Sequence, residues 1–154
     1  MQADGGSIED DGDPGEVAPG VSIIETTADV GLHVDAATLD QLFERAAVGL
    51  LAVMRGDAVV CAVVERLITV RAEDRETLLV AWLQRLLYEF DGEGMLYAEF
   101  SCRVQEREMQ ARCRGERFDL HRHFLETEIK AVTYHRLRVE ESGDGWVAEV
   151  ILDV

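Results

Sequence analysis

The sequence has few of the features that mark secreted, membrane-spanning or zinc-binding proteins. It contains three cysteines and no CxxC pair, which argues against a disulfide framework and against a zinc knuckle. Because Cys61, Cys102 and Cys113 lie among apolar neighbours, we predict small buried or half-buried side chains there. No apolar run approaches the roughly 20 residues of a membrane span, and no basic-then-apolar N-terminal segment resembles a secretory signal. We therefore predict a cytoplasmic protein without membrane contact.

Motifs of nucleotide-binding proteins and hydrolases are also missing. Neither GxxxxGK[ST] nor GxGxxG occurs, and these are the glycine-rich loops that cradle phosphates. GxSxG and HExxH are absent as well, so the sequence shows no conventional nucleophilic or zinc-hydrolase centre.

Basic residues are scarce, and Lys130 is the only lysine. The chain has 15 Lys and Arg against 31 Asp and Glu, a formal net charge of −16. This field repels phosphates and so disfavours direct, sequence-independent nucleic-acid binding, whereas it favours cations and basic protein surfaces. A high-GC genome or a high-salt cytoplasm is an alternative explanation of the charge.

The N-terminal segment differs in composition from the rest of the chain. Residues 1–20 contain six acidic residues, no basic residue and both prolines, and we predict a disordered acidic tail there. The remaining residues, 21–154, suit one domain with a single core.

The apolar pattern of residues 21–154 predicts an α+β fold. One helix is predicted from Thr38, with Gln41 as its capping partner and Gly56 as its stop. A second is predicted from Asp74 to Asp91-Gly92. Turns are predicted at 28–31 and 141–145. The predicted strands cover 22–27, 32–34, 59–71, 95–104, 109–114, 133–140 and 146–154. Short connections make consecutive strands antiparallel, so we expect two amphipathic helices packed on a largely antiparallel sheet.

Two aspartates are candidate metal ligands. Asp29 lies in the predicted turn, and Asp153 precedes Val154, the end of the chain. The side chain of Asp153 and the terminal carboxylate of Val154 repel each other, and a hard cation relieves that repulsion. If Asp29 lies beside them, the three form an oxygen-rich site. The alternatives are that Asp29 bonds its own turn backbone and that the terminus is frayed.

Three further residues are weaker candidates. His121 and His123 point the same way if their segment is extended, which could make an imidazole pair, although loop histidines also commonly bond to backbone. Lys130 could make a specific contact as a point charge, or it could simply be the one lysine of an arginine-rich chain.

Several segments, in the same order and at similar spacings, resemble the archease family. Val21 to the end of the chain is covered. The matching segments are TTADVG (26–31) for HTADVG, WLQRLLYEFD (82–91) for WLNELLYLFD, GERFD (115–119), His123 and EIKAVTYH (128–135) for GExFD…H…EVKAVTYH, and GWVAEVILDV (145–154) for GWxAxVILDI.

The resemblance implies an archease-like single domain that assists an RtcB-type RNA ligase and is not itself an enzyme. Archeases promote guanylylation and repeated turnover of that ligase in tRNA splicing or RNA repair. The resemblance also implies a divalent metal, typically Ca²⁺ with Mg²⁺ or Mn²⁺ as alternatives, at positions matching Asp29, Asp153 and Val154. Lys130 and His123 match other family positions and are candidates for partner contact.

The sequence departs from the family pattern at two positions, and two other functions are alternatives. Thr26 stands where the family has histidine, and Phe124 stands where many relatives have proline. The first alternative function is a chaperone-like binder of RNA-modifying enzymes, such as a tRNA methyltransferase. The second is a metal-dependent hydrolase that uses the same carboxylates.

Overall fold

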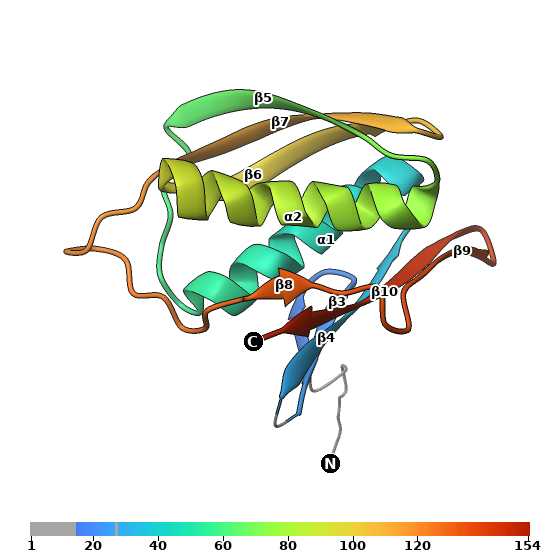
Figure 1. Cartoon of the computed structure of the whole chain (residues 1–154), viewed down its shortest axis with the longest axis horizontal. Coiled ribbons are helices and arrows are strands. Elements are labelled where there is room, and N and C mark those ends of the chain that lie inside the picture. Colours follow the sequence, from blue (N-terminus) through green and yellow to red (C-terminus); the bar gives the residue numbers. More distant parts are fainter. Residues whose placement is uncertain (1–14, 27) are drawn as a thin grey trace, which may run out of the picture.

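The fold consists of two antiparallel sheets that enclose a layer of helices (Figure 1). The computed structural model describes residues 15–26 and 28–154, and within these residues six strands form a larger sheet and three form a smaller one. The larger sheet contains β2 (Glu16–Ala18), β3 (Val21–Glu25), β4 (Asp29–Ala36), β8 (Ala131–Val132), β9 (Arg138–Ser142) and β10 (Gly145–Asp153). The smaller sheet contains β5 (Val64–Arg71), β6 (Met95–Val104) and β7 (Glu108–Arg117).

The larger sheet has the order β2-β3-β4-β10-β8, with β9 also paired to β10, and the smaller has the order β5-β7-β6. Helices α1 (Leu39–Arg55) and α2 (Arg75–Glu93) each contact strands of both sheets. The predicted class of helices packed on antiparallel β-structure is confirmed. The helices cover two sheets, however, and not the single sheet that we predicted.

Helix α1 begins and ends at the predicted residues. The hydroxyl of Thr38 accepts from the backbone N–H of Gln41 at 3.1 Å, and Gln41 Oε1 accepts from Ala37 N at 2.9 Å. Gly56 ends the helix with a φ of 53°. At Gly49 a Cβ atom would lie 2.9 Å from a methyl group of Val21, so glycine lets α1 pack closely on the larger sheet.

Helix α2 begins as predicted but is slightly longer. Asp74 accepts from the backbone N–H of Thr77 at 2.8 Å, and hydrogen bonds from Thr77 lower the pKa of this carboxyl. The predicted stop at Asp91-Gly92 is wrong, because the helix continues to Glu93 and ends at Gly94, whose φ is 69°. Trp82 is fully buried at its centre, and its indole N–H donates to the carbonyl of Phe43 on α1 at 3.0 Å.

Two predicted strands are shorter than expected. Residues 59–63 precede β5 without forming a strand. Only residues 138–140 of the predicted strand 133–140 lie in a strand, β9, and residues 133–137 leave the ladder between β8 and β9. Thr133 directs both its N–H and its hydroxyl to the carbonyl of Ile151, at 3.0 and 2.9 Å. Arg136 adopts a φ of 56° in the turn that precedes β9.

The predicted boundary between tail and domain also changes. Residues 1–14 of the predicted tail lie outside the described residues. From Glu16 onward the chain forms β2, which pairs with β3 through Glu16↔Ser22 and Ala18↔Val21. Order therefore begins before Val21, because β2 adds hydrogen bonds along the edge of β3.

The cysteine prediction is confirmed at two positions and wrong at the third. Cys102 and Cys113 are buried, and burial raises the pKa of both thiols, to about 12 for Cys113. Cys61 is exposed, because its segment lies outside the sheets. Within residues 15–26 and 28–154, no helix combines the length and apolar character that a membrane span requires.

The packing of α1 between the sheets predicts where truncation is costly. Leu50 is fully buried on α1, whereas Leu67 is 74% exposed on β5. We expect Leu50→Ala to lower the free energy of unfolding by about 2–5 kcal/mol, because it leaves a cavity. The control Leu67→Ala should change it by less than about 0.5 kcal/mol. Urea unfolding followed by circular dichroism measures both, and equal effects would contradict the layered packing.

Candidate metal site at the end of the last strand

The β4–β10 ladder brings the two candidate aspartates together. Asp29 is the first residue of β4, Asp153 is the last of β10, and the antiparallel register places them directly opposite each other. Directly opposite residues have Cβ atoms about 4.5–5.5 Å apart. Their strand neighbours Val30 and Leu152 are buried, so both aspartates point to the outer face of the larger sheet.

Thr26 orients the carboxylate of Asp29. Its hydroxyl donates to Asp29 Oδ1 at 2.7 Å, and its backbone N–H donates to the Asp29 carbonyl at 3.0 Å. The turn therefore ends one residue before Asp29, which lies in the strand and not in the predicted turn 28–31. Among the described residues, no hydrogen bond is seen to Asp29 Oδ2.

The end of the chain is anchored and not frayed. Strand β10 lies between β4 and β8, and the carbonyl of Asp153 accepts from the backbone N–H of Lys130 at 2.7 Å. Val154 is partly buried against the core. Val154 therefore follows Asp153 from a fixed backbone and lies next to the aspartate pair.

These donors fit a hard divalent cation. Carboxylate oxygens are the ligands that Ca²⁺, Mg²⁺ and Mn²⁺ prefer, and such an ion offsets the repulsion among them. Across the described residues, no group of three or more His, Cys, Asp or Glu side chains could hold a metal ion. The set at Asp29 and Asp153 has only two such side chains, and the main-chain carboxylate of Val154 is the predicted third donor. Metal binding therefore stays a prediction.

The other two candidate residues lie in different environments. The side chain of Lys130 is exposed, and its backbone bond to Asp153 keeps it next to the aspartate pair. The side chain of His123 is fully buried, so it offers no surface for direct contact with a partner. His121 is exposed beside it, and no hydrogen bond joins the two imidazoles.

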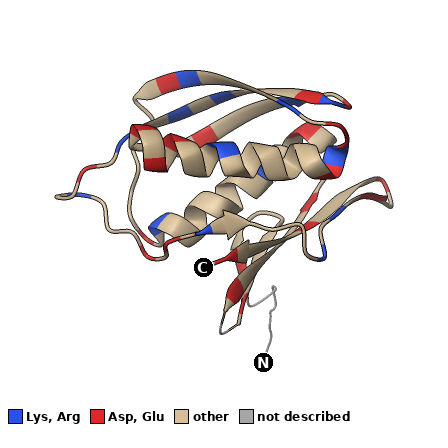
Figure 2. Ribbon diagram, viewed as in Figure 1, with Lys and Arg blue, Asp and Glu red and all other residues tan. Residues whose placement is uncertain are grey.

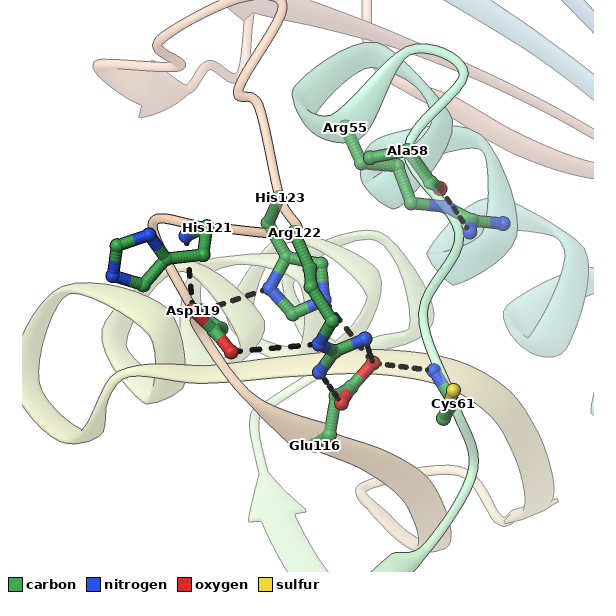
Figure 3. Close-up of polar contacts among 8 residues, drawn as sticks. All are labelled: Arg55, Ala58, Cys61, Glu116, Asp119, His121, Arg122 and His123. Atoms are coloured by element: carbon green, nitrogen blue, oxygen red, sulfur yellow. Dashed lines mark hydrogen bonds and ion pairs between the residues drawn. The ribbon is translucent and has the colours of Figure 1, made fainter.

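His123 belongs to a buried polar network centred on Glu116 (Figure 3). Glu116 Oε2 accepts from the backbone N–H of Cys61 at 2.6 Å and lies 3.1 Å from His123 Nε2, and Arg122 pairs with both oxygens of this carboxylate. His123 Nδ1 accepts from the backbone N–H of Asp119 at 2.8 Å. That bond leaves the ring proton on Nε2, where it donates to Glu116.

The network fixes the loop after β7 to the segment before β5. Hydrogen bonds from Arg122, Cys61 and His123 lower the pKa of Glu116 to about 2. Phe118 also packs against the ring of His123, with centroids 5.8 Å apart. Glu116 was not among the predicted site residues, although it stands in the GERFD segment, because nothing local shows that a glutamate will be buried beside Cys61.

A family model matches the chain over the same region. The Archease protein family (MTH1598/TM1083) matches residues 22–154. The chain belongs to the archease family. The archease of Pyrococcus furiosus is 34% identical over 135 residues, which cover 84% of this chain and 95% of that protein. The archease of Methanosarcina acetivorans is 36% identical over 136 residues, which cover 85% and 93%.

Solved structures of the archease family agree with this fold. The solution structure of protein 1598 from Methanobacterium thermoautotrophicum has a TM-score of 0.74 at 29% identity and covers 89% of this chain and 100% of its own. A Thermotoga maritima crystal structure, described as an archease and possible chaperone, has a TM-score of 0.60 at 24% identity. It covers 85% of this chain and 94% of its own, and it supports the fold alone. The resemblance seen in the sequence is thus confirmed.

The Glu116 network predicts a specific dependence of stability on pH. The folded-state pKa of the Glu116 carboxyl is about 2, below the ordinary 4.5. The ionised carboxylate therefore stabilises the fold above pH 4.5, and this contribution is lost as the pH falls toward 2. We expect Glu116→Gln to lower the unfolding midpoint at pH 7, with the difference from wild type shrinking between pH 4.5 and 2.

Thermal unfolding at several pH values measures this effect. Glu65→Gln is the matched control, because Glu65 is half-exposed and meets Arg112 at 3.4 Å on the sheet surface. That pair should contribute little at any pH. A Glu116→Gln difference that does not change with pH would contradict the account.

Proposed function

We propose that this protein activates an RtcB-type RNA ligase, promoting its guanylylation and repeated turnover in tRNA splicing or RNA repair, without catalysing a reaction itself. The active feature would be a divalent ion, Ca²⁺ before Mg²⁺ or Mn²⁺, held by Asp29, Asp153 and the terminal carboxylate of Val154. One observation carries the proposal, namely that the first residue of β4 and the last of β10 are paired in register. Membership of the archease family supports it.

The acidic surface suits a basic partner. The net charge is −16. Acidic residues, drawn in red, lie at the ends of β4 and β10 beside the C-terminus (Figure 2). Such a field attracts a basic surface and speeds encounter with it. The outer face of the larger sheet is therefore the face that we expect to meet the ligase, near its nucleotide pocket.

On the outer face of the larger sheet, each candidate residue would have a separate role. Asp29 and Asp153 supply carboxylate oxygens, and Thr26 holds one of these carboxylates in place. Lys130 adds a cation beside them, where it can meet a phosphate or an acidic group of the partner. When bound, the metal would supply positive charge for organising a polyphosphate.

Removal of the paired carboxylates tests the proposal. We expect Asp29→Asn and Asp153→Asn each to lose most of the stimulation of multiple-turnover ligation, because either change removes a charged ligand of the ion. Asp35→Asn is the matched control, since Asp35 is exposed further along the same face of β4. The measurement uses the purified ligase from the same organism, with calorimetric titration of Ca²⁺ alongside.

Three results would reject this function or favour one of the alternatives. Full stimulation by both variants would reject the metal-dependent activator. Binding of an RNA-modifying enzyme that is indifferent to Asp29 would favour the chaperone-like role. Turnover of phosphate esters by the protein alone would favour a hydrolase.

The hydrogen bond from Thr26 predicts a second effect. Residues that orient a metal ligand typically change metal affinity by about 10- to 100-fold when removed. We therefore expect Thr26→Val, which keeps the shape and loses the hydroxyl, to weaken Ca²⁺ binding by at least about tenfold. Thr69→Val on the smaller sheet is the control, and equal Ca²⁺ affinity of all three proteins would contradict a positioning role for Thr26.

A further inference from the structure

The outer face of β4 and β10 contains a groove next to the aspartate pair. Its volume is about 350 Å³, within the range of small-ligand sites. Residues 29, 31 and 33 of β4 share this face, and the distance along them is about 13 Å at 3.3 Å per residue. Along the groove the cross-strand pairs are Asp29↔Asp153, Gly31↔Ile151 and His33↔Glu149.

The middle of the groove is open because residue 31 is a glycine. Gly31 does not have a positive φ, and a Cβ atom there would meet Ile151 and Ile24 only at 3.6–4.0 Å, which is ordinary contact. Glycine within a strand weakens it and often marks a close approach by a ligand. Neither backbone conformation nor packing requires this glycine. Its effect is to leave an apolar strip between Ile24, which is 63% exposed, and Ile151.

A cationic side chain, that of Arg136, lines the same groove. Residues 133–137, which leave the ladder, place His135 and Arg136 on it. The guanidinium of Arg136 has no hydrogen-bond or ion-pair partner among the described residues. The backbone of this residue has a φ of 56°, which is unfavourable for a residue other than glycine. Strained residues of this kind are typical of ligand clamps. With a divalent ion at Asp29, the groove would present two separate cationic centres to an anion.

At the far end of the groove, the carboxylate of Glu149 can accept hydrogen bonds. Glu149 lies 3.2 Å from His33 Nδ1 and 3.4 Å from Arg138 Nε, and these contacts lower the pKa of its carboxyl. An ionised carboxylate with two neighbours still has lone pairs for an N–H donor. Guanine offers a pair of N–H donors on one edge, whereas the same edge of adenine offers an acceptor beside its amino group.

We propose that this groove binds a nucleoside polyphosphate chelated to the divalent ion, with its phosphates between the ion and Arg136, its base over Gly31 and the N–H edge of that base toward Glu149. The inference rests on the proposed function, because it requires the ion at Asp29. The arrangement favours guanine over adenine. Since the protein carries a charge of −16, a free polyphosphate is repelled, and binding should require the divalent ion.

Titration of the ¹⁵N-labelled full chain with GTP in saturating Ca²⁺ tests this inference. We expect amide shift changes centred on Gly31 and Arg136, weaker binding of ATP by at least several-fold, and no binding after chelation of the metal. Inorganic triphosphate should shift Arg136 and leave Gly31 unmoved. Calorimetry of the same samples gives the affinities.

Two variants separate binding from folding. Gly31→Ala fills the groove with a methyl group for which there is room, and Arg136→Gly removes the guanidinium while relieving the positive φ. Both should unfold at or above the wild-type temperature and bind GTP at least tenfold more weakly. Arg103→Gln, an exposed change on the smaller sheet, should leave binding unchanged.

The possible failures can be told apart. Absence of Ca²⁺ binding would overturn the proposed function itself. Intact Ca²⁺ binding without shifts at Gly31 and Arg136 would overturn the nucleotide inference alone. If Gly31→Ala weakened binding to the ligase while GTP did not bind the free protein, the occupant would be a ligase side chain, and the inference would again be wrong.

Discussion

The antiparallel pairing of β10 with β4 is the constraint on which the rest of the molecule depends. It joins residues 146–153 to residues 29–36, so the last strand of the chain lies in the interior of the larger sheet, between β4 and β8. Such a long-range contact costs loop-closure entropy that only burial and the full ladder can offset. The proposed metal site therefore exists only when the whole domain has folded, because its two aspartates lie far apart in the sequence and meet only at one end of this ladder.

The register of that ladder couples the core to the site. Val30, Leu32, Val150 and Leu152 are buried on the inner face, while their alternate neighbours form the acid pair and the groove outside. Because side chains alternate with a period of two, a slip of one residue would exchange the faces. Burial of apolar side chains against α1 thus excludes a one-residue slip from the register that aligns Asp29 with Asp153.

Acidic residues in this protein also stabilise exposed backbone. Asp40 and Glu44 of α1 accept from the backbone N–H groups of Val104 and Cys102 at 2.7 and 2.8 Å, which covers the edge of β6. Glu116 does the same for Cys61. Unpaired strand edges favour aggregation, so these carboxylates are part of the fold and not only solvated charge. They lie on the inner layers and the smaller sheet, apart from the carboxylates assigned to metal and partner.

The sequence alone determined the features that depend on neighbours within a few residues. Thr38 and Asp74 begin the helices as predicted, because a cap bonds to an N–H three residues away. Apolar periodicity placed β6 and β10, and the linked motifs identified the family. Only tertiary structure decided that Asp29 faces Asp153, that a glutamate is buried beside Cys61, and that Gly31 opens a groove. Those outcomes depend on register and on packing between distant segments, and no local pattern encodes either.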